Sequence, residues 1–229
     1  MRRSMQWVGL VLASGLLGAP AAGDLVNGDF DDPNTPPPGW SSGTGGAVVV
    51  EDDPADSDGD DELCIDATAT YTWDASAGAW DGSGAMDSAV QVASIPSGRD
   101  TLLFSAQSIS LQAAGALDTV SIGVAVDYKD TNGSDLRVEQ TWTPGSPGGT
   151  TLVLTDPDFT QPMTVSVLGQ ALGVPSDWDD GTQDGEQQVL HARGYFDDFQ
   201  FVPEPASLTL VALGGAVLLR RRRRQSQRA

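Results

Sequence analysis

The chain has 229 residues, with 32 Asp and Glu against 12 Lys and Arg, and its formal net charge at pH 7 is −20. That length suits one domain with a core of its own. Residues 24–202 hold 31 of the acidic residues and only four basic ones, so this segment would repel phosphates. A role in binding nucleic acid or anionic lipid is therefore excluded, whereas cations would be attracted.

Residues 1–23 have the pattern of a secretory signal peptide. Two arginines follow the first residue, Met5–Gly18 is apolar, and residues 19–21 are small enough for cleavage. We predict that the mature chain begins between Ala22 and Asp24. A buried N-terminal helix is disfavoured because the segment has no polar face, and an arginine pair so near the start is ordinary for a Sec signal.

The body, residues 24–201, is predicted to be all-β because apolar and polar residues alternate along it. In residues 119–128 the alternation places five apolar residues on one face, namely Val120, Ile122, Val124, Val126 and Tyr128. Similar stretches predict strands at 46–51, 63–73, 88–95, 101–112, 136–143, 150–155, 163–169 and 194–202. Asp130-Thr131-Asn132-Gly133 predicts a hairpin turn. Since no stretch keeps a helical period, we predict an antiparallel β-sandwich, in jelly-roll form.

Cys64 and the acidic segment 51–62 each allow a structural and a functional interpretation. Cys64 is the only cysteine, so no internal disulfide forms. We expect it to be a small buried apolar residue, with a reactive or intermolecular thiol as the alternative. The acidic segment 51–62 does not have the spacing of an EF-hand, and we expect a solvated turn there, with weak calcium binding as the alternative.

Catalytic motifs are lacking in this sequence. His191 is the only histidine, which excludes a metal site made of several histidines. No Gly-x-Ser-x-Gly elbow is present, and the few glutamates of the body fall in no recognisable pair. We therefore expect His191 to lie on an ordinary strand and the protein not to be an enzyme, with a secreted glycan hydrolase as the alternative.

The tail, residues 202–229, combines three features in order. Pro203 and Pro205 keep the backbone extended, as a protease that binds its substrate as a strand requires. Ala206–Leu219 is apolar and would span about 20 Å as a helix, which is short against roughly 30 Å of hydrocarbon. The arginines of 220–224 would keep the end of this helix on the cytoplasmic side.

This order of Val-Pro-Glu-Pro, apolar stretch and arginine cluster resembles the PEP-CTERM sorting signal of bacterial proteins that an exosortase recognises. The resemblance implies export, anchoring in the membrane through the C-terminal helix before processing, and release to the cell surface or a polysaccharide matrix. The residues expected to take part in sorting are Pro203, Glu204, Pro205, Arg220, Arg221 and Arg222. A plain C-terminal membrane anchor is the alternative.

The two ends of the body resemble the opening and closing strands of galactose-binding-like jelly rolls and related carbohydrate-binding modules. At the opening, Asn27, Gly28, Phe30, Gly39 and Trp40 match that family, while Asp31 replaces its usual glutamate. At the close, residues 194–201 show its aromatic-Asp-Asp-hydrophobic pattern. The resemblance implies that the two termini of the domain lie side by side.

The same family often holds a structural calcium ion between these termini. Alternation back from Phe199 and Phe201 places Asp197 in the core, where a carboxylate needs a partner or a metal. Asp31 would supply a second oxygen ligand, and Asp198 is the alternative to Asp197 if a bulge shifts the register. The competing interpretation is an aspartate that hydrogen-bonds to backbone amides.

Sugar binding needs exposed aromatic faces, and the sequence offers Trp80 and Trp142 as candidates, with core or loop packing as the alternative for each.

The role predicted for the protein is structural or adhesive, at the surface or in the extracellular matrix. A carbohydrate-binding module for an exopolysaccharide is the alternative.

Overall fold

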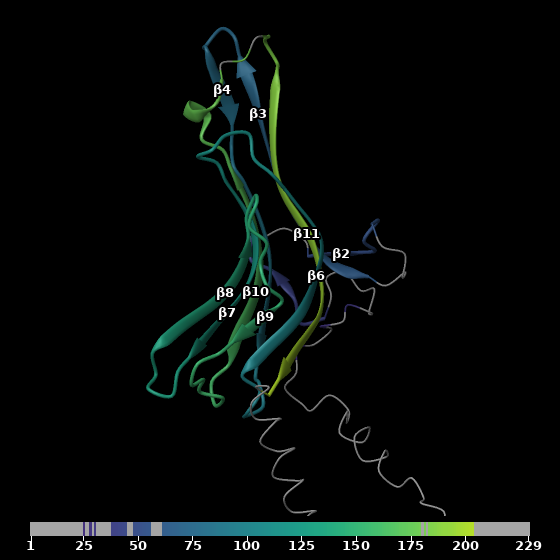
Figure 1. The fold of residues 1–229 in the computed structure, drawn as a ribbon, viewed down its shortest axis with the longest axis vertical. Coiled ribbons are helices and arrows are strands. Elements are labelled where there is room, and N and C mark those ends of the chain that lie inside the picture. The colour runs from purple at the N-terminus through teal and green to yellow at the C-terminus, as the bar shows by residue number, and fades with distance from the viewer. Residues whose placement is uncertain are drawn as a thin grey trace, which may run out of the picture.

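The structure is a computed structural model that describes residues 25, 28, 30, 38–44, 48–55, 61–179, 181 and 183–203. This part forms two antiparallel sheets that pack face to face (Figure 1). The described strands are β1 (Ser41–Ser42), β2 (Val49–Glu51), β3 (Glu62–Asp74), β4 (Ala79–Gly82), β5 (Ala85–Ala93), β6 (Thr101–Gln112), β7 (Thr119–Lys129), β8 (Asp135–Trp142), β9 (Thr151–Val153), β10 (Met163–Leu172) and β11 (Gln187–Val202).

The order of the strands is that of a jelly roll. One sheet, which we call sheet A, runs β1-β5-β10-β7-β8, and the other, sheet B, runs β2-β3-β11-β6-β9 with β4 beside β3. Leaving out the short β1, β2 and β4, the first strand pairs with the last, the second with the seventh, the third with the sixth and the fourth with the fifth. This nesting confirms the predicted antiparallel sandwich in jelly-roll form.

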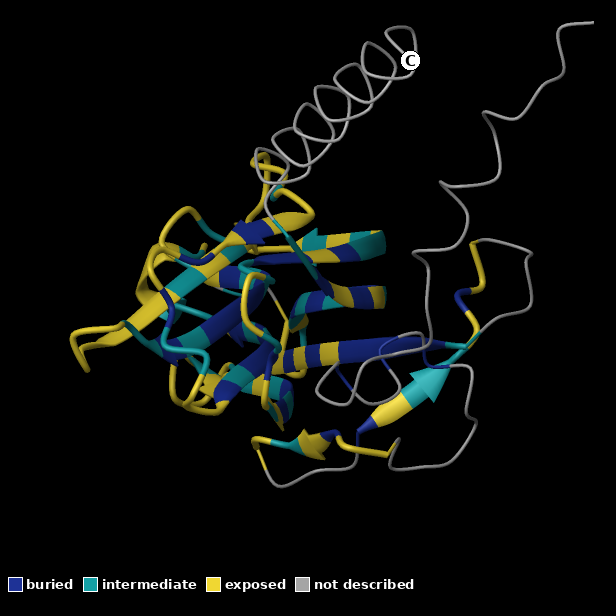
Figure 2. Cartoon of the chain, turned by 90° about the horizontal axis from the view of Figure 1, so that it is seen from below, coloured by how far each residue is buried: buried dark blue, intermediate teal, exposed yellow. Residues whose placement is uncertain are grey.

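The core lies between the two sheets, and buried residues alternate with exposed ones along the strands (Figure 2). The five apolar residues predicted to share one face of residues 119–128 are all buried. Full burial of such side chains contributes about 1.5–3 kcal/mol each. Aromatic rings in contact fill the core at the level of the bulge in β11, and they are Phe30, Trp40, Phe104, Trp142, Phe196 and Phe199.

The opening segment of the body lies beside the closing strand, as the family resemblance implies. The Phe199 amide donates a hydrogen bond to the Gly28 carbonyl oxygen at 2.8 Å. Phe30 is fully buried, and its ring lies 6.1 Å from that of Phe199. A Cβ atom at Gly28 would come within 2.5 Å of the Phe199 carbonyl oxygen, so the close approach requires glycine there.

A bulge interrupts the alternation of β11. The register against β6 shifts between Asp197 and Gln200, and Asp198 has a left-handed φ of 55°. Because of the extra residue, Phe196 and not Asp197 points into the core together with Phe199. The alternation that placed Asp197 in the core is therefore wrong. Asp197 is half-buried opposite Ser105, and Asp198, the alternative inward residue, is exposed.

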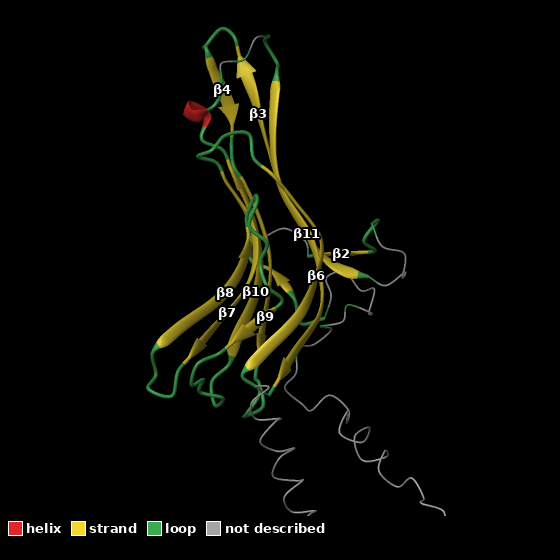
Figure 3. Cartoon of the chain, in the orientation of Figure 1, coloured by secondary structure: helices red, strands yellow, loops and turns green. Residues whose placement is uncertain are grey.

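The described part contains one helical turn, the 3₁₀ helix η1 (Pro175–Asp177), near the end of the sandwich where the β3–β4 hairpin lies (Figure 3). Pro175 occupies the first helical position. An amide hydrogen there would have no partner within the helix, so proline costs the helix no hydrogen bond. The loop that carries η1 leads from β10 to β11 and therefore crosses from sheet A to sheet B.

Candidate functional site

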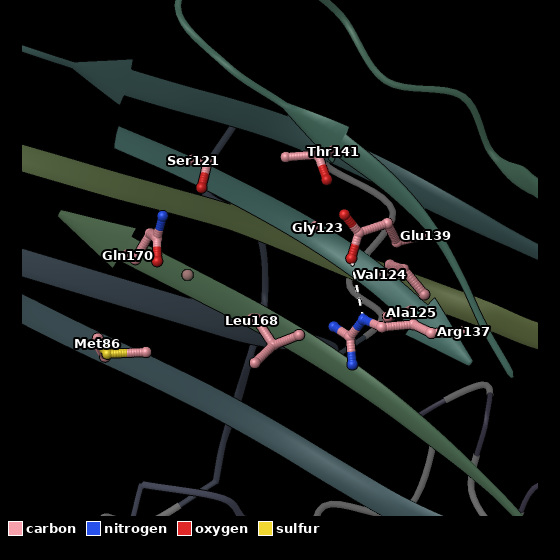
Figure 4. A pocket seen from close by; sticks show the side chains of 11 residues that line it. Met86, Ser121, Gly123, Val124, Ala125, Arg137, Glu139, Thr141, Leu168 and Gln170 are labelled. Carbon is pink, nitrogen blue, oxygen red and sulfur yellow. Dashed lines mark hydrogen bonds and ion pairs between the residues drawn. The ribbon is translucent and has the colours of Figure 1, made fainter. Parts of the chain in front are cut away.

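A groove of about 320 Å³ opens on the outer face of sheet A, the face turned away from the core (Figure 4). Arg137 and Glu139 on β8 form one side, Met86 on β5 forms the other, and Leu168 on β10 lies between them. Met86 is 55% exposed. Ser121, Thr141 and Gln170 add hydroxyl and amide groups that can both donate and accept hydrogen bonds.

The floor of this groove follows from the alternation of β7. The large residues of β7 point into the core, which leaves the small side of the strand, including Gly123 and Ala125, on the outer face. A Cβ atom at Gly123 would come within 2.7 Å of the Gln140 carbonyl oxygen. Glycine therefore allows β8 to pair closely with β7 and keeps the floor of the groove low.

Charges in the groove pair with one another. The Arg137 guanidinium donates to Glu139 at 3.0 Å and to both Asp127 carboxylate oxygens, at 2.9 and 3.2 Å. Burial alone would lower the pKa of Arg137, but the two carboxylates outweigh burial and raise it. The guanidinium is thus held in a fixed position and stays charged, as a donor for ligand oxygens needs.

A second hollow, of about 440 Å³, continues along the same face, and Arg137 lines both hollows. It contains Lys129 and Asp135, which form an ion pair at 2.6 Å. The two hollows together make an open surface across β5, β10, β7 and β8, on which small, polar and paired charged side chains lie beside the apolar Met86, Leu136 and Leu168. Such a surface suits a ligand with many hydroxyl groups and no net charge.

Trp80 lies in an aromatic cluster beside the β3–β4 hairpin. Its ring meets Trp73 at 5.5 Å and Trp178 at 5.7 Å, and its indole N–H donates to the Asp179 carbonyl oxygen at 3.2 Å. Trp178 in turn donates to the Asp118 carboxylate at 3.0 Å. Trp80 is half-buried, so its ring anchors the loop that carries η1 while part of it still faces solvent.

Trp142 belongs to the core. It is 7% exposed and packs against Phe104 and Phe196. A Cβ atom at Gly148 would come within 2.7 Å of its indole ring, because the loop after β8 covers it. Trp142 therefore offers no exposed ring face in this structure, and the packing alternative applies to it.

Near the start of β3, two carboxylates are buried that the sequence pattern did not indicate as buried. Asp53 and Glu62 are each 1% exposed, and the Asp53 amide donates to Glu62 Oε2 at 2.9 Å. Asp53 Oδ2 is buried and has no hydrogen-bond partner among the described residues. The last residue pair between β3 and β11 is Leu63 with Phe196, and Glu62 and Asp197 are the next residues on the two strands. The expected solvated turn at 51–62 is thus wrong at its two ends.

The predicted calcium ligands are only partly placed. Asp31 lies outside the described residues, so its distance from Asp197 is not given by the structure. Within the described ranges, no group of three His, Cys, Asp or Glu side chains is arranged to hold a metal ion. The calcium site therefore remains a prediction.

Cys64 is buried, in agreement with the expected apolar role. Burial, together with the nearby Glu51, raises the pKa of the thiol to about 12, which makes it a poor nucleophile at neutral pH. Glu51 also accepts a hydrogen bond from Arg193 at 2.6 Å and so ties β2 to β11.

His191 lies on β11 as expected, with its Nε2 atom 2.8 Å from Ser110 Oγ.

The sorting segment follows directly on the last strand. β11 ends at Val202, and Pro203 is the last described residue. Residues 201–224 match the family model of the PEP-CTERM protein-sorting motif.

The PEP-CTERM motif confirms the resemblance stated for the tail and indicates an exported precursor that an exosortase processes. Glu204, Pro205, Arg220, Arg221 and Arg222 lie outside the described residues, as does the predicted apolar helix 206–219. In the part of the chain that the structure describes, no helix is long and apolar enough to cross a membrane.

No curated protein matches the chain. A solved structure of the CBM22-1 and GH10 modules of a Clostridium thermocellum endo-1,4-β-D-xylanase, complexed with xylohexaose, is similar at 11% identity and a TM-score of 0.31. The match covers 80% of this chain but only 28% of the xylanase chain. A likeness of this size shows neither a ligand nor an activity for this protein.

Proposed function

We propose that this protein is exported, processed by an exosortase at Pro203-Glu204-Pro205, and retained at the cell surface or in the extracellular matrix in a structural or adhesive role. The PEP-CTERM motif at 201–224 is the observation that carries this proposal. The signal-peptide pattern of residues 1–23 supports export. The acidic body supports the destination, since its self-repulsion keeps it soluble and hydrated among polymers.

Fractionation of cells that express a tagged chain tests this function. The tag is inserted in the exposed loop at 143–150, so it stays on the protein when either end of the chain is cleaved off. The wild-type chain should appear outside the cell without its tail, whereas Glu204→Ala combined with Pro205→Ala should leave a longer form in the membrane. Arg228→Ala, beyond the motif, is the matched control and should behave as wild type. Identical fates for all three chains would contradict the proposal.

As a second function, we propose that the groove on sheet A binds a neutral polysaccharide. The support is its composition, with Arg137 held by two carboxylates beside hydroxyl and amide groups over a floor of small residues. Binding of the secreted protein to an array of neutral and acidic glycans should be abolished by Ser121→Trp, which fills the groove. Thr70→Trp, exposed on the outer face of sheet B, should bind like wild type. Equal binding by both variants would contradict this function.

We further propose that the domain holds a structural calcium ion beside β11. Asp197 and Asp31 are its proposed ligands. The buried Asp53 and Glu62, and the unpartnered Asp53 Oδ2, support the proposal, because buried carboxylates need compensation by a cation or hydrogen bonds. Calcium prefers such hard oxygen ligands, and when bound it would neutralise repulsion among these acids.

A further inference from the structure

The sorting motif begins inside the folded domain. Its first matched residue is Phe201, whereas β11 ends only at Val202. Phe201 is 1% exposed and pairs with Leu102 on β6, and the Arg99 side chain donates to its carbonyl oxygen at 3.5 Å. No spacer therefore separates the sandwich from Pro203, where the Pro-Glu-Pro sequence starts.

The reach of the chain beyond the sandwich is short. From Val202 to Ala206, where the apolar stretch begins, a fully extended backbone spans at most about 14 Å. In a precursor held through residues 206–219, the folded sandwich would thus lie almost against the membrane. An exosortase would have to bind the Pro-Glu-Pro sequence within this gap.

The end of the sandwich that would face the membrane is acidic. The end of β11 lies among the lower loops of Figure 1, beside the start of β6, and the β7–β8 turn lies at the same end of the sandwich. Five aspartates occupy these loops or the strand ends next to them, against the two basic residues Arg99 and Lys129, and they are Asp100, Asp130, Asp135, Asp156 and Asp158. Anionic lipid would repel this end, so the tight geometry is disfavoured further.

The last residues of β11 have fewer strand partners than its middle. Pairing of β11 with β3 stops at Phe196, whereas pairing with β6 continues through Gln200 to Val202. Among the described residues, Gln200–Val202 therefore pair with β6 alone, beyond the hydrogen bond that the Phe199 amide donates to the Gly28 carbonyl oxygen. Strand ends of this kind open locally at a lower free energy than the core.

We propose that the folded sandwich restrains exosortase processing, and that the enzyme gains its substrate when residues 200–202 detach from β6. The inference rests on the proposed processing at Pro203-Glu204-Pro205 and adds its regulation. The partner is the membrane-embedded processing enzyme, which binds an extended segment. The fold supplies that segment only through local opening of β11.

A flexible spacer tests the proposal without touching the fold. A Gly-Ser insert of about eight residues between Val202 and Pro203 adds a reach of roughly 16 Å. In a pulse-chase experiment on the full chain, the precursor with the insert should convert several-fold faster than the wild type. Conversion at an equal or lower rate would overturn the proposal.

A pair of point variants separates local from global opening. Phe201→Ala loosens the end of β11, whereas Leu190→Ala removes a fully buried side chain from the other end of the same strand. Phe201→Ala should be processed several-fold faster than Leu190→Ala, and equal rates would overturn the proposal. If neither the wild type nor the spacer variant is processed at all, the proposed function itself fails, which is a distinguishable result.

Discussion

Asp118 joins two loops at the end of the sandwich where Trp80 lies. Its carboxylate accepts the amide of Val174 at 2.8 Å, the amides of Ala114 and Gly115 at 2.8 and 2.6 Å, and the Trp178 indole N–H at 3.0 Å. Burial alone would raise the pKa of Asp118, but these donors outweigh burial and lower it below its usual value of 3.8. One side chain thereby positions both the β6–β7 loop and the loop that carries η1.

We predict that Asp118→Asn lowers the free energy of unfolding at pH 7 by about 1–3 kcal/mol, because an amide donor would then face backbone donors. Urea unfolding measures the loss, and Asp81→Asn, exposed on β4, is the control. The pKa is lower in the folded state, so the stabilisation is complete above pH 3.8 and is lost as pH falls through the lowered value. The gap between variant and wild type should therefore narrow in acid, and a gap that stays constant would contradict the assignment.

At the scale of single elements, the β7–β8 hairpin is specified by its turn residues. Asp130 Oδ1 accepts the amides of Asn132 at 3.0 Å and Ser134 at 2.7 Å. Gly133 has a φ of 84°, which residues with a side chain rarely adopt. This turn fixes the register that places Arg137 opposite Asp127 across the two strands.

We predict that Gly133→Ala lowers the free energy of unfolding by about 1 kcal/mol, because alanine is strained at this φ. Gly149→Ala is the matched control, since Gly149 does not have a positive φ and a Cβ atom there meets only ordinary contacts. Thermal melting of the two variants compares them directly. A control that loses as much stability as Gly133→Ala would show that φ is not the cause.

The strands whose bounds could be predicted from the sequence are those that have one face in the core and the other in solvent. β6 matches its predicted range of 101–112, and β3 differs from its prediction by one residue at each end. The first half of β11 was missed, because its inward residues include the small Ala192 and Gly194 and the contrast with its outer face is weak. The bulge at Asp198 was named only as an alternative, since it depends on pairing with β6.

For the whole molecule, local patterns indicated the fold better than they indicated the site. The signatures around Gly28 and residues 194–201 placed the two ends of the body side by side, and the hydrogen bond from the Phe199 amide to the Gly28 carbonyl oxygen confirms it. The groove draws on β5, β7, β8 and β10, so only the strand register brings its residues together. The burial of Asp53 could not be predicted either, because Asp53 belongs to an acidic stretch of a kind that is typical of a solvated turn.

We predict that removing calcium lowers the melting temperature of the secreted protein. Loss of the ion would leave acids beside β11 uncompensated, so calorimetry with a chelator should show a lower midpoint that added calcium restores. Asp197→Asn should abolish this difference, whereas Asp198→Asn, exposed at the bulge, should keep it. An unchanged midpoint in the wild type would remove the calcium proposal.

The intact mass of the protein recovered from outside the cell tests its proposed export and processing most directly. The mass should correspond to a chain that begins between residues 22 and 24 and ends near Pro203-Glu204-Pro205, with the apolar stretch and the arginines gone. Recovery of the chain from the cytosol, with both ends intact, would contradict the proposed function.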